Sequence, residues 1–173
     1  SLEKGVPHVV PDILNQYSSS AWSDAAVIIP WVVYQMYGDK RILEESWKCM
    51  HEWVDYITSQ CGKNGLWQTG FQYGDWLALD KEESADRTGA TDKYMIANAY
   101  YLYVTDLVKQ TAEVLRKADA VEKYEKLYEV TLEAFREEYY TSTGRIVSET
   151  QTGAILSLYF NLAREKDRPR ILQ

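Results

Sequence analysis

Two tryptophan–carboxylate pairs are the strongest candidates in this sequence for a ligand-binding site. Trp22 and Asp24 stand two residues apart in front of an apolar segment, and Asp75 and Trp76 are adjacent, directly after Gly74. Indole faces stack on the apolar C–H faces of sugars, and carboxylates accept hydrogen bonds from sugar hydroxyls. The two pairs therefore predict a carbohydrate-binding site formed by Trp22, Asp24, Asp75 and Trp76.

Asp24 also has a simpler interpretation, as the residue that begins a helix. Its position before Ala25 predicts an N-cap whose side chain accepts hydrogen bonds from the free amides of the first turn. Trp22 would then lie at the mouth of the helix rather than on its buried stripe. A cap and a sugar contact are compatible, and the sequence leaves both roles open.

Composition narrows the classes of partner. With 173 residues, 46% of them hydrophobic, the chain can bury a substantial core, which favours a single domain. A formal charge of −7 and a pI near 4.9 argue against nucleic acid and anionic membranes as partners. No apolar run approaches membrane-spanning length. The only histidines, His8 and His51, form no metal motif, so we expect neither a metal nor another cofactor.

Hydrophobic spacing predicts a helical chain with one long connection. Apolar residues recur at steps of three and four in five segments, which we expect to be helices. An extended lead-in at 1–21 precedes them, and the stretch 62–89, which contains five glycines, predicts a long loop. The predicted helices cover about 25–37, 40–61, 92–108, 119–135 and 151–162.

Consecutive helices joined alternately by tight turns and longer loops predict an all-α fold of antiparallel helix pairs. Both an α/α toroid and a helical solenoid have this organisation, but no fixed repeat period is present, which favours the toroid. In a toroid the loops at one end converge on a central pocket. Trp22 and Trp76 can therefore meet, although about fifty residues separate them.

Several motifs along nearly the whole chain resemble the catalytic domain of bacterial α-L-rhamnosidases, and they occur in the order typical of that family. The residues that carry the resemblance are Gly5-Val6-Pro7, Val10-Pro11, Trp22-Ser23-Asp24-Ala25, Pro30-Trp31, Tyr37-Gly38-Asp39, Ile42-Leu43, Trp53-Val54-Asp55-Tyr56, Tyr73-Gly74-Asp75-Trp76-Leu77, the tyrosine-rich segment 98–103 and Gln151-Thr152. One residue departs from the pattern, because the family usually has glycine where Ser23 stands.

The resemblance implies a partial (α/α)6 barrel, of which residues 1–173 would be a single internal segment about half as long as the family's domain. Such enzymes remove terminal α-L-rhamnose from rhamnosides and invert the anomeric configuration, so a rhamnose-containing glycoside is the implied partner. Trp22 and Trp76 would face the sugar, with Asp24 and Asp75 near the pocket rim. Bacterial cytoplasm or periplasm is the implied location, since a leader sequence could precede the segment.

The resemblance also implies that no catalytic residue lies in this segment. The family's general-acid glutamate belongs to an Asp-Gln-Arg-Asp-Glu cluster expected before the region matched by Ser1, and its general base is expected well beyond Gln173. The local acids have other interpretations: Glu82, Glu83 and Asp86 as a solvated polar loop, and Glu149 as a charge favoured near a helix start. The segment alone is therefore expected to be inactive.

A second class of function stays open, namely a non-catalytic helical module that binds a glycan or a peptide on an aromatic concave surface. This alternative predicts a complete, well-behaved monomer. The glycosidase interpretation instead predicts exposed apolar helix faces and self-association through them.

Overall fold

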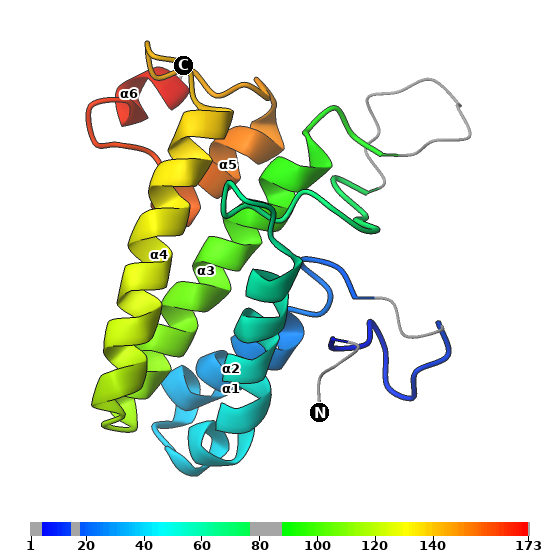
Figure 1. Cartoon of the computed structure of the whole chain (residues 1–173), viewed down its shortest axis with the longest axis vertical. Coiled ribbons are helices and arrows are strands. Elements are labelled where there is room, and N and C mark those ends of the chain that lie inside the picture. Colours follow the sequence, from blue (N-terminus) through cyan, green and yellow to red (C-terminus); the bar gives the residue numbers. More distant parts are fainter. Residues whose placement is uncertain (1–4, 15–17, 77–87, 173) are drawn as a thin grey trace.

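The computed structural model describes residues 5–14, 18–76 and 88–172, and within them the chain is all-helical. The prediction of an all-α fold is therefore confirmed. The acids Glu82, Glu83 and Asp86 lie outside the described residues. The helices, in chain order, are α1 (Ala25–Tyr37), α2 (Arg41–Gln60), α3 (Lys93–Val114), α4 (Ala118–Tyr139), α5 (Gln151–Tyr159) and α6 (Arg168–Ile171) (Figure 1).

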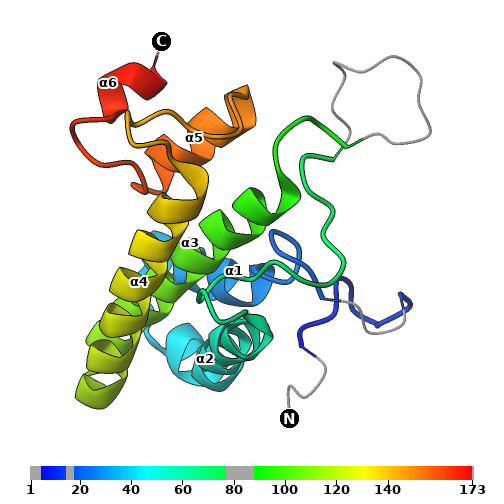
Figure 2. The ribbon, with the colours of Figure 1, turned by 45° about the horizontal axis from the view of Figure 1, so that its top comes forward.

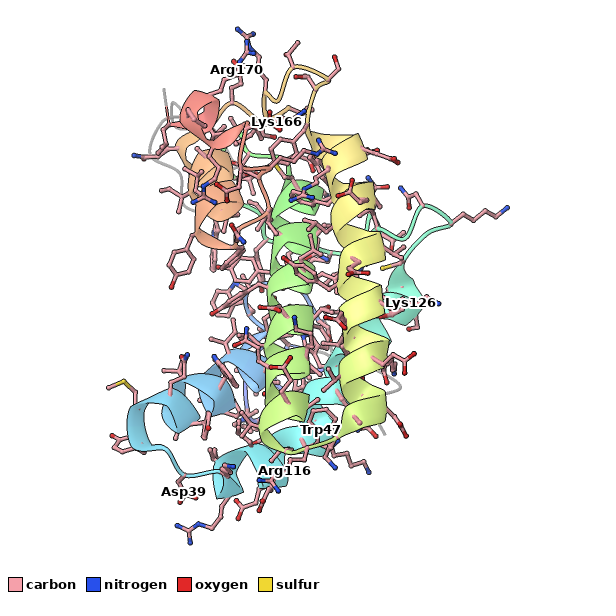
Figure 3. All side chains as sticks on the ribbon, turned by 90° about the vertical axis from the view of Figure 1, so that its left-hand side faces the viewer. Asp39, Trp47, Arg116, Lys126, Lys166 and Arg170 are labelled. Carbon is pink, nitrogen blue, oxygen red and sulfur yellow. The ribbon has the colours of Figure 1, made fainter. Side chains whose placement is uncertain are left out.

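The helices are organised around α3. Two consecutive hairpins, α1–α2 and α3–α4, pack against each other, and α5 follows as a further helix against α3. In Figure 3, α3 and α4 lie side by side along most of their length. At the lower end of that view, Trp47 of α2 lies beside the α3–α4 turn, where Nζ of Lys117 is 5.4 Å from its ring centroid.

Local sequence explains why the helices begin and end where they do. α1 ends at Gly38, whose left-handed backbone (φ 69°) lets its N–H donate to the carbonyl of Tyr34. α3 begins after Asp92, whose side chain accepts from the amides of Tyr94 and Met95. Thr150 accepts in the same way from the amide of Gly153 at the start of α5. The two latter caps fix the starts of α3 and α5.

The core surrounds α3, which buries residues on several of its faces. Val104 and Tyr101 of α3 pack with Trp53 and Ile57 of α2 and with α1, while a second group joins α3 to α4 and α5. The Tyr101 hydroxyl lies 2.8 Å from Oγ1 of Thr58, which supplies a partner for a phenol deep in the core. The side of α3 that faces α2 is thus fixed by both packing and hydrogen bonding.

The structure revises some of the predicted boundaries. The last predicted helix ends at Tyr159 rather than near Leu162, and the short α6 was not predicted, because four residues are too few to show a helical period. The α2–α3 connection is slightly longer than predicted, at 61–92, of which 77–87 lie outside the described residues. No helix in the described part of the chain is both long and apolar enough to cross a membrane.

Candidate carbohydrate-binding site

The structure brings Trp22 and Trp76 together, with their ring centroids 5.7 Å apart. Tyr73 joins both rings, since its centroid lies 5.3 Å from that of Trp22 and 5.1 Å from that of Trp76, and it is nearly parallel to the latter. Phe71 packs edge-on against Tyr73 at 4.8 Å. We call Trp22, Phe71, Tyr73 and Trp76 the aromatic platform. The predicted meeting of the two tryptophans is confirmed.

Three rings of the platform are open to solvent. Trp22 is 41% exposed, Trp76 49% and Phe71 52%. Large aromatic side chains that share one surface and remain half exposed are typical of binding sites. The sequence showed Phe71 and Tyr73 only as aromatic residues of a long loop, and the concentration of aromatic residues at 67, 71, 73 and 76 was the available signal for them.

His8 lies beneath the platform and was missed as a neighbour of the site. Its ring centroid is 5.2 Å from that of Tyr73 and 6.4 Å from that of Trp22. It is only 9% exposed, and neither ring nitrogen has a hydrogen-bond partner among the described residues. Burial lowers the pKa of His8 from its ordinary value, against a smaller raising effect of Asp12, so its neutral form is favoured.

The side chain of Asp24 does not occupy the position that the sequence predicted. Its side chain makes no cap hydrogen bond to the first turn of α1 and is fully buried. Its Oδ2 accepts from the backbone N–H of Ala21 at 2.6 Å, and its Oδ1 accepts from the indole Nε1 of Trp53 at 2.7 Å. Asp24 does directly precede the first residue of α1, as predicted, but the predicted cap hydrogen bonds are absent, and the prediction of a carboxylate at the rim is wrong. Asp24 instead joins the turn before α1 to the core.

The environment of Asp24 also changes its ionisation. Burial raises its pKa from 3.8 to about 6, although the hydrogen bonds from Trp53 and Ala21 favour the charged form and limit the rise. The turn that Asp24 supports contains Ala21, whose backbone lies in the left-handed region (φ 65°). This conformation is energetically unfavourable for a residue that has a Cβ atom. The hydrogen bond from the Ala21 amide helps to hold that conformation, immediately before Trp22.

Asp75 lies at the junction of three connections. Its Oδ2 accepts from the hydroxyl of Thr91 at 3.1 Å, and that hydroxyl lies 2.7 Å from Oγ1 of Thr150. Gly89 passes so close that a Cβ there would lie 2.8 Å from Oδ2 of Asp75. The carboxylate is partly buried, and through Thr91 its hydrogen bond connects the α2–α3 loop to Thr150 at the start of α5.

Ser23, the departure from the family pattern, has a defined role in the structure. Its hydroxyl donates to the carbonyl of Val6 at 2.8 Å and accepts from the amide of Ser19 at 3.2 Å. The residue is buried and does not have the positive φ that would require glycine. The serine thus adds bonds between the lead-in and the turn, in a backbone conformation that it tolerates.

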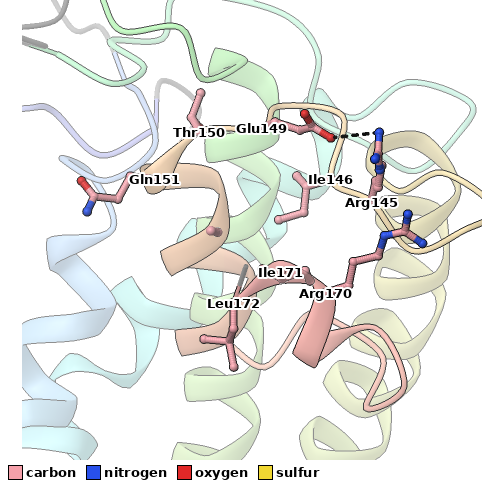
Figure 4. A pocket seen from close by; sticks show the side chains of 9 residues that line it. Arg145, Ile146, Glu149, Thr150, Gln151, Arg170, Ile171 and Leu172 are labelled. Atoms are coloured by element: carbon pink, nitrogen blue, oxygen red, sulfur yellow. Dashed lines mark ion pairs between the residues drawn. The ribbon is translucent and has the colours of Figure 1, made fainter.

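A separate cavity of about 700 Å³ lies beside the start of α5 and is distinct from the platform. Figure 4 shows Arg145 and Arg170 on one side of it and Gln151 on the other, with an ion pair of 3.7 Å between Arg145 and Glu149. None of the four predicted site residues lines it. Across residues 5–14, 18–76 and 88–172, no group of three or more His, Cys, Asp or Glu side chains is placed to hold a metal ion.

The chain has the organisation of an α/α toroid domain. Its helix pairs pack against each other in chain order, and aromatic residues gather where the connections before α1 and α3 meet. A family model described as the bacterial α-L-rhamnosidase 6 hairpin glycosidase domain matches residues 2–171. The chain therefore belongs to this family, and the predicted resemblance is confirmed.

Individual relatives agree with this assignment. An α-L-rhamnosidase of Formosa agariphila is 34% identical over 172 residues, which cover 98% of this chain and 18% of the relative. The crystal structure of an Aspergillus terreus α-L-rhamnosidase superposes with a TM-score of 0.90 at 32% identity, covering 97% of this chain and 20% of that one. The crystal structure of the Streptomyces avermitilis enzyme complexed with L-rhamnose superposes with a TM-score of 0.85 at 30% identity, covering 99% of this chain and 16% of that one. The chain thus spans about a fifth or less of the length of these relatives.

Proposed function

We propose that the chain supplies part of the sugar-binding surface of an α-L-rhamnosidase, with Trp22 and Trp76 stacked against L-rhamnose. The observation that carries the proposal is the ring pair itself, 5.7 Å apart and half exposed. The relative from Streptomyces avermitilis, which superposes along 99% of the chain, was crystallised with L-rhamnose. This similarity supports rhamnose as the ligand of the platform.

The platform has the chemistry that a deoxy sugar needs. L-Rhamnose carries a methyl group and C–H faces, which gain free energy when indole rings shield them from water. Asp75 would accept a hydrogen bond from a sugar hydroxyl, since a carboxylate accepts more than the one bond it receives from Thr91. Asp24, being enclosed, would contribute by supporting the turn that carries Trp22 rather than by touching sugar.

The reaction itself needs groups beyond the platform. Inverting hydrolysis requires a carboxylic acid that protonates the leaving oxygen and a carboxylate about 6.5–9.5 Å away that activates water. We propose that both belong to the longer rhamnosidase and that residues 1–173 bind sugar without cleaving it.

Removing one ring of the pair tests the binding role. Trp76→Ala is expected to weaken L-rhamnose binding by about 1–3 kcal/mol, because the variant loses one aromatic face of the site. Isothermal titration of the chain with L-rhamnose measures the change. Tyr37→Ala, at the exposed end of α1, is the matched control for loss of an exposed aromatic ring. Unchanged affinity in a folded Trp76→Ala variant would remove Trp76 from the site.

A further inference from the structure

The side chain of Gln72 connects two segments that are 52 residues apart. Its Oε1 accepts both from the backbone N–H and from the hydroxyl of Ser20, each at 2.9 Å. Gln72 is 5% exposed and Ser20 is 4% exposed, so water competes little for these bonds. Figure 2 shows part of the α2–α3 loop passing close to the turn before α1.

Each end of this connection lies next to a ring of the platform. Ser20 precedes Trp22 by two residues, and Gln72 precedes Tyr73 directly, whose ring lies 5.3 Å from that of Trp22. On the other side of Trp22, Asp24 accepts from the amide of Ala21. Trp22 is 41% exposed, so packing holds only part of its ring. The position of the ring therefore also depends on how the backbone at residue 22 is held.

We propose that Gln72 is a positioning residue that sets Trp22 at its distance and angle to Trp76. The geometry assigns it this role because one amide oxygen satisfies both donors of Ser20 and thereby fixes the turn against the α2–α3 loop. Its relevance to sugar rests on the proposed function of the platform. Gln72 itself touches no sugar, so it acts through Trp22.

The positioning role is tested without sugar by fluorine NMR of the chain labelled with 5-fluorotryptophan. Six tryptophans give six resonances, and Trp22→Phe and Trp76→Phe assign the two that matter. Gln72→Met keeps the length of the side chain but removes the acceptor. We expect it to move or broaden the resonances of Trp22 and Trp76, while those of the buried Trp53 and Trp31 stay in place. A merely structural role would move the core resonances as well.

Gln68→Met is the matched control, because Gln68 lies in the same loop but bonds to Asn64, Glu138 and Tyr139. It should leave the resonances of Trp22 and Trp76 unchanged. If Gln72→Met moves all six resonances, the milder variant Ser20→Ala distinguishes a positioning role from a general structural role, since it removes only one of the two donors to Gln72. A shift confined to Trp22 and Trp76 in Ser20→Ala supports the proposal. Unchanged Trp22 and Trp76 resonances in the folded variant overturn it.

Titration of the same samples with L-rhamnose tests the link to binding. Gln72→Met should raise the dissociation constant about three- to tenfold, the range expected for one misplaced aromatic contact, and Gln68→Met should not change it. If the unaltered chain binds no L-rhamnose, the proposed function fails, whereas the fluorine spectra still decide the role of Gln72. Shifted Trp22 resonances with unchanged affinity would overturn the link to sugar.

Discussion

Asp24 is a carboxylate whose burial makes the stability of the chain depend on pH. Its pKa in the folded chain is raised to about 6 from 3.8, mainly by burial. Between these values the folded chain binds a proton that the unfolded chain has released. The free energy of unfolding therefore falls as pH rises through this window, and the contribution of Asp24 is fully present only below about pH 4.

Replacement of Asp24 by asparagine exposes this dependence. The free energy of unfolding of the unaltered chain, relative to that of Asp24→Asn, should fall by about 2–3 kcal/mol between pH 4 and pH 7. Urea unfolding of both proteins across this range measures the difference. Asp119→Asn, at an exposed position of α4, controls for the change of charge. A difference that stays constant from pH 4 to pH 7 would refute the assigned ionisation of Asp24.

At the level of single residues, the sequence was informative about aromatic groups and less so about acids. Trp22 stands just before a helix start and Trp76 lies in the long loop 62–89, and their meeting followed from the expected convergence of loops in a toroid. The partner of Asp24 is the indole of Trp53, 29 residues further along the chain, and no local pattern indicates that bond. Gln72 was missed for the same reason, since a glutamine in a loop carries no signal of a buried bond to Ser20.

At the level of helices, α1 differs from α3 in how much apolar surface it leaves open. α3 is packed by α1, α2, α4 and α5, whereas Ile29, Val32 and Met36 of α1 are exposed by 59%, 43% and 73%. Their spacing of three and four places them on one face of the helix. The glycosidase interpretation predicted such apolar faces, and the structure contains one.

The exposed stripe of α1 leads to a prediction about association. The chain is expected to self-associate at micromolar concentrations, because burying the stripe removes apolar surface from water. Val32→Lys combined with Met36→Lys should bring the mass in sedimentation equilibrium down to the 20.1 kDa of one chain.

Val130→Lys, on α4, is the control for this experiment, since Val130 is 61% exposed but lies outside the stripe. It should leave the association unchanged. An unaltered chain that sediments as a monomer at all concentrations would show that the stripe does not drive association.

The helices themselves followed well from hydrophobic spacing, with boundaries correct within a few residues for α1 and α2. Longer-range contacts set the course of the α2–α3 loop. The α2–α3 loop is bound to α3 by the side-chain amide of Asn98, which accepts from the N–H of Trp67 at 2.8 Å and donates to its carbonyl at 3.0 Å. This pairing across 31 residues holds the loop against α3, and helical periodicity contains no information about it.

At the level of the whole molecule, two hairpins and α5 superpose on rhamnosidases of which they cover a fifth or less. We expect residues 1–173 alone to show no hydrolysis of an aryl α-L-rhamnoside, since the acid and base are proposed to lie elsewhere in the enzyme. Each of these groups contributes roughly 10²–10⁴-fold to the rate. Release of the aryl group, followed by absorbance, is the measurement. Turnover above that of a Trp76→Ala preparation would place catalytic carboxylates within the chain.

The proposed function requires that Trp22 and Trp76 together form the face on which the sugar lies. A crystal structure of the chain grown with L-rhamnose tests it most directly. We expect the pyranose ring or its methyl group to lie in van der Waals contact, at about 4 Å, with both indoles. L-Rhamnose bound elsewhere, for example in the cavity beside α5, with the two indoles free of ligand, would contradict it.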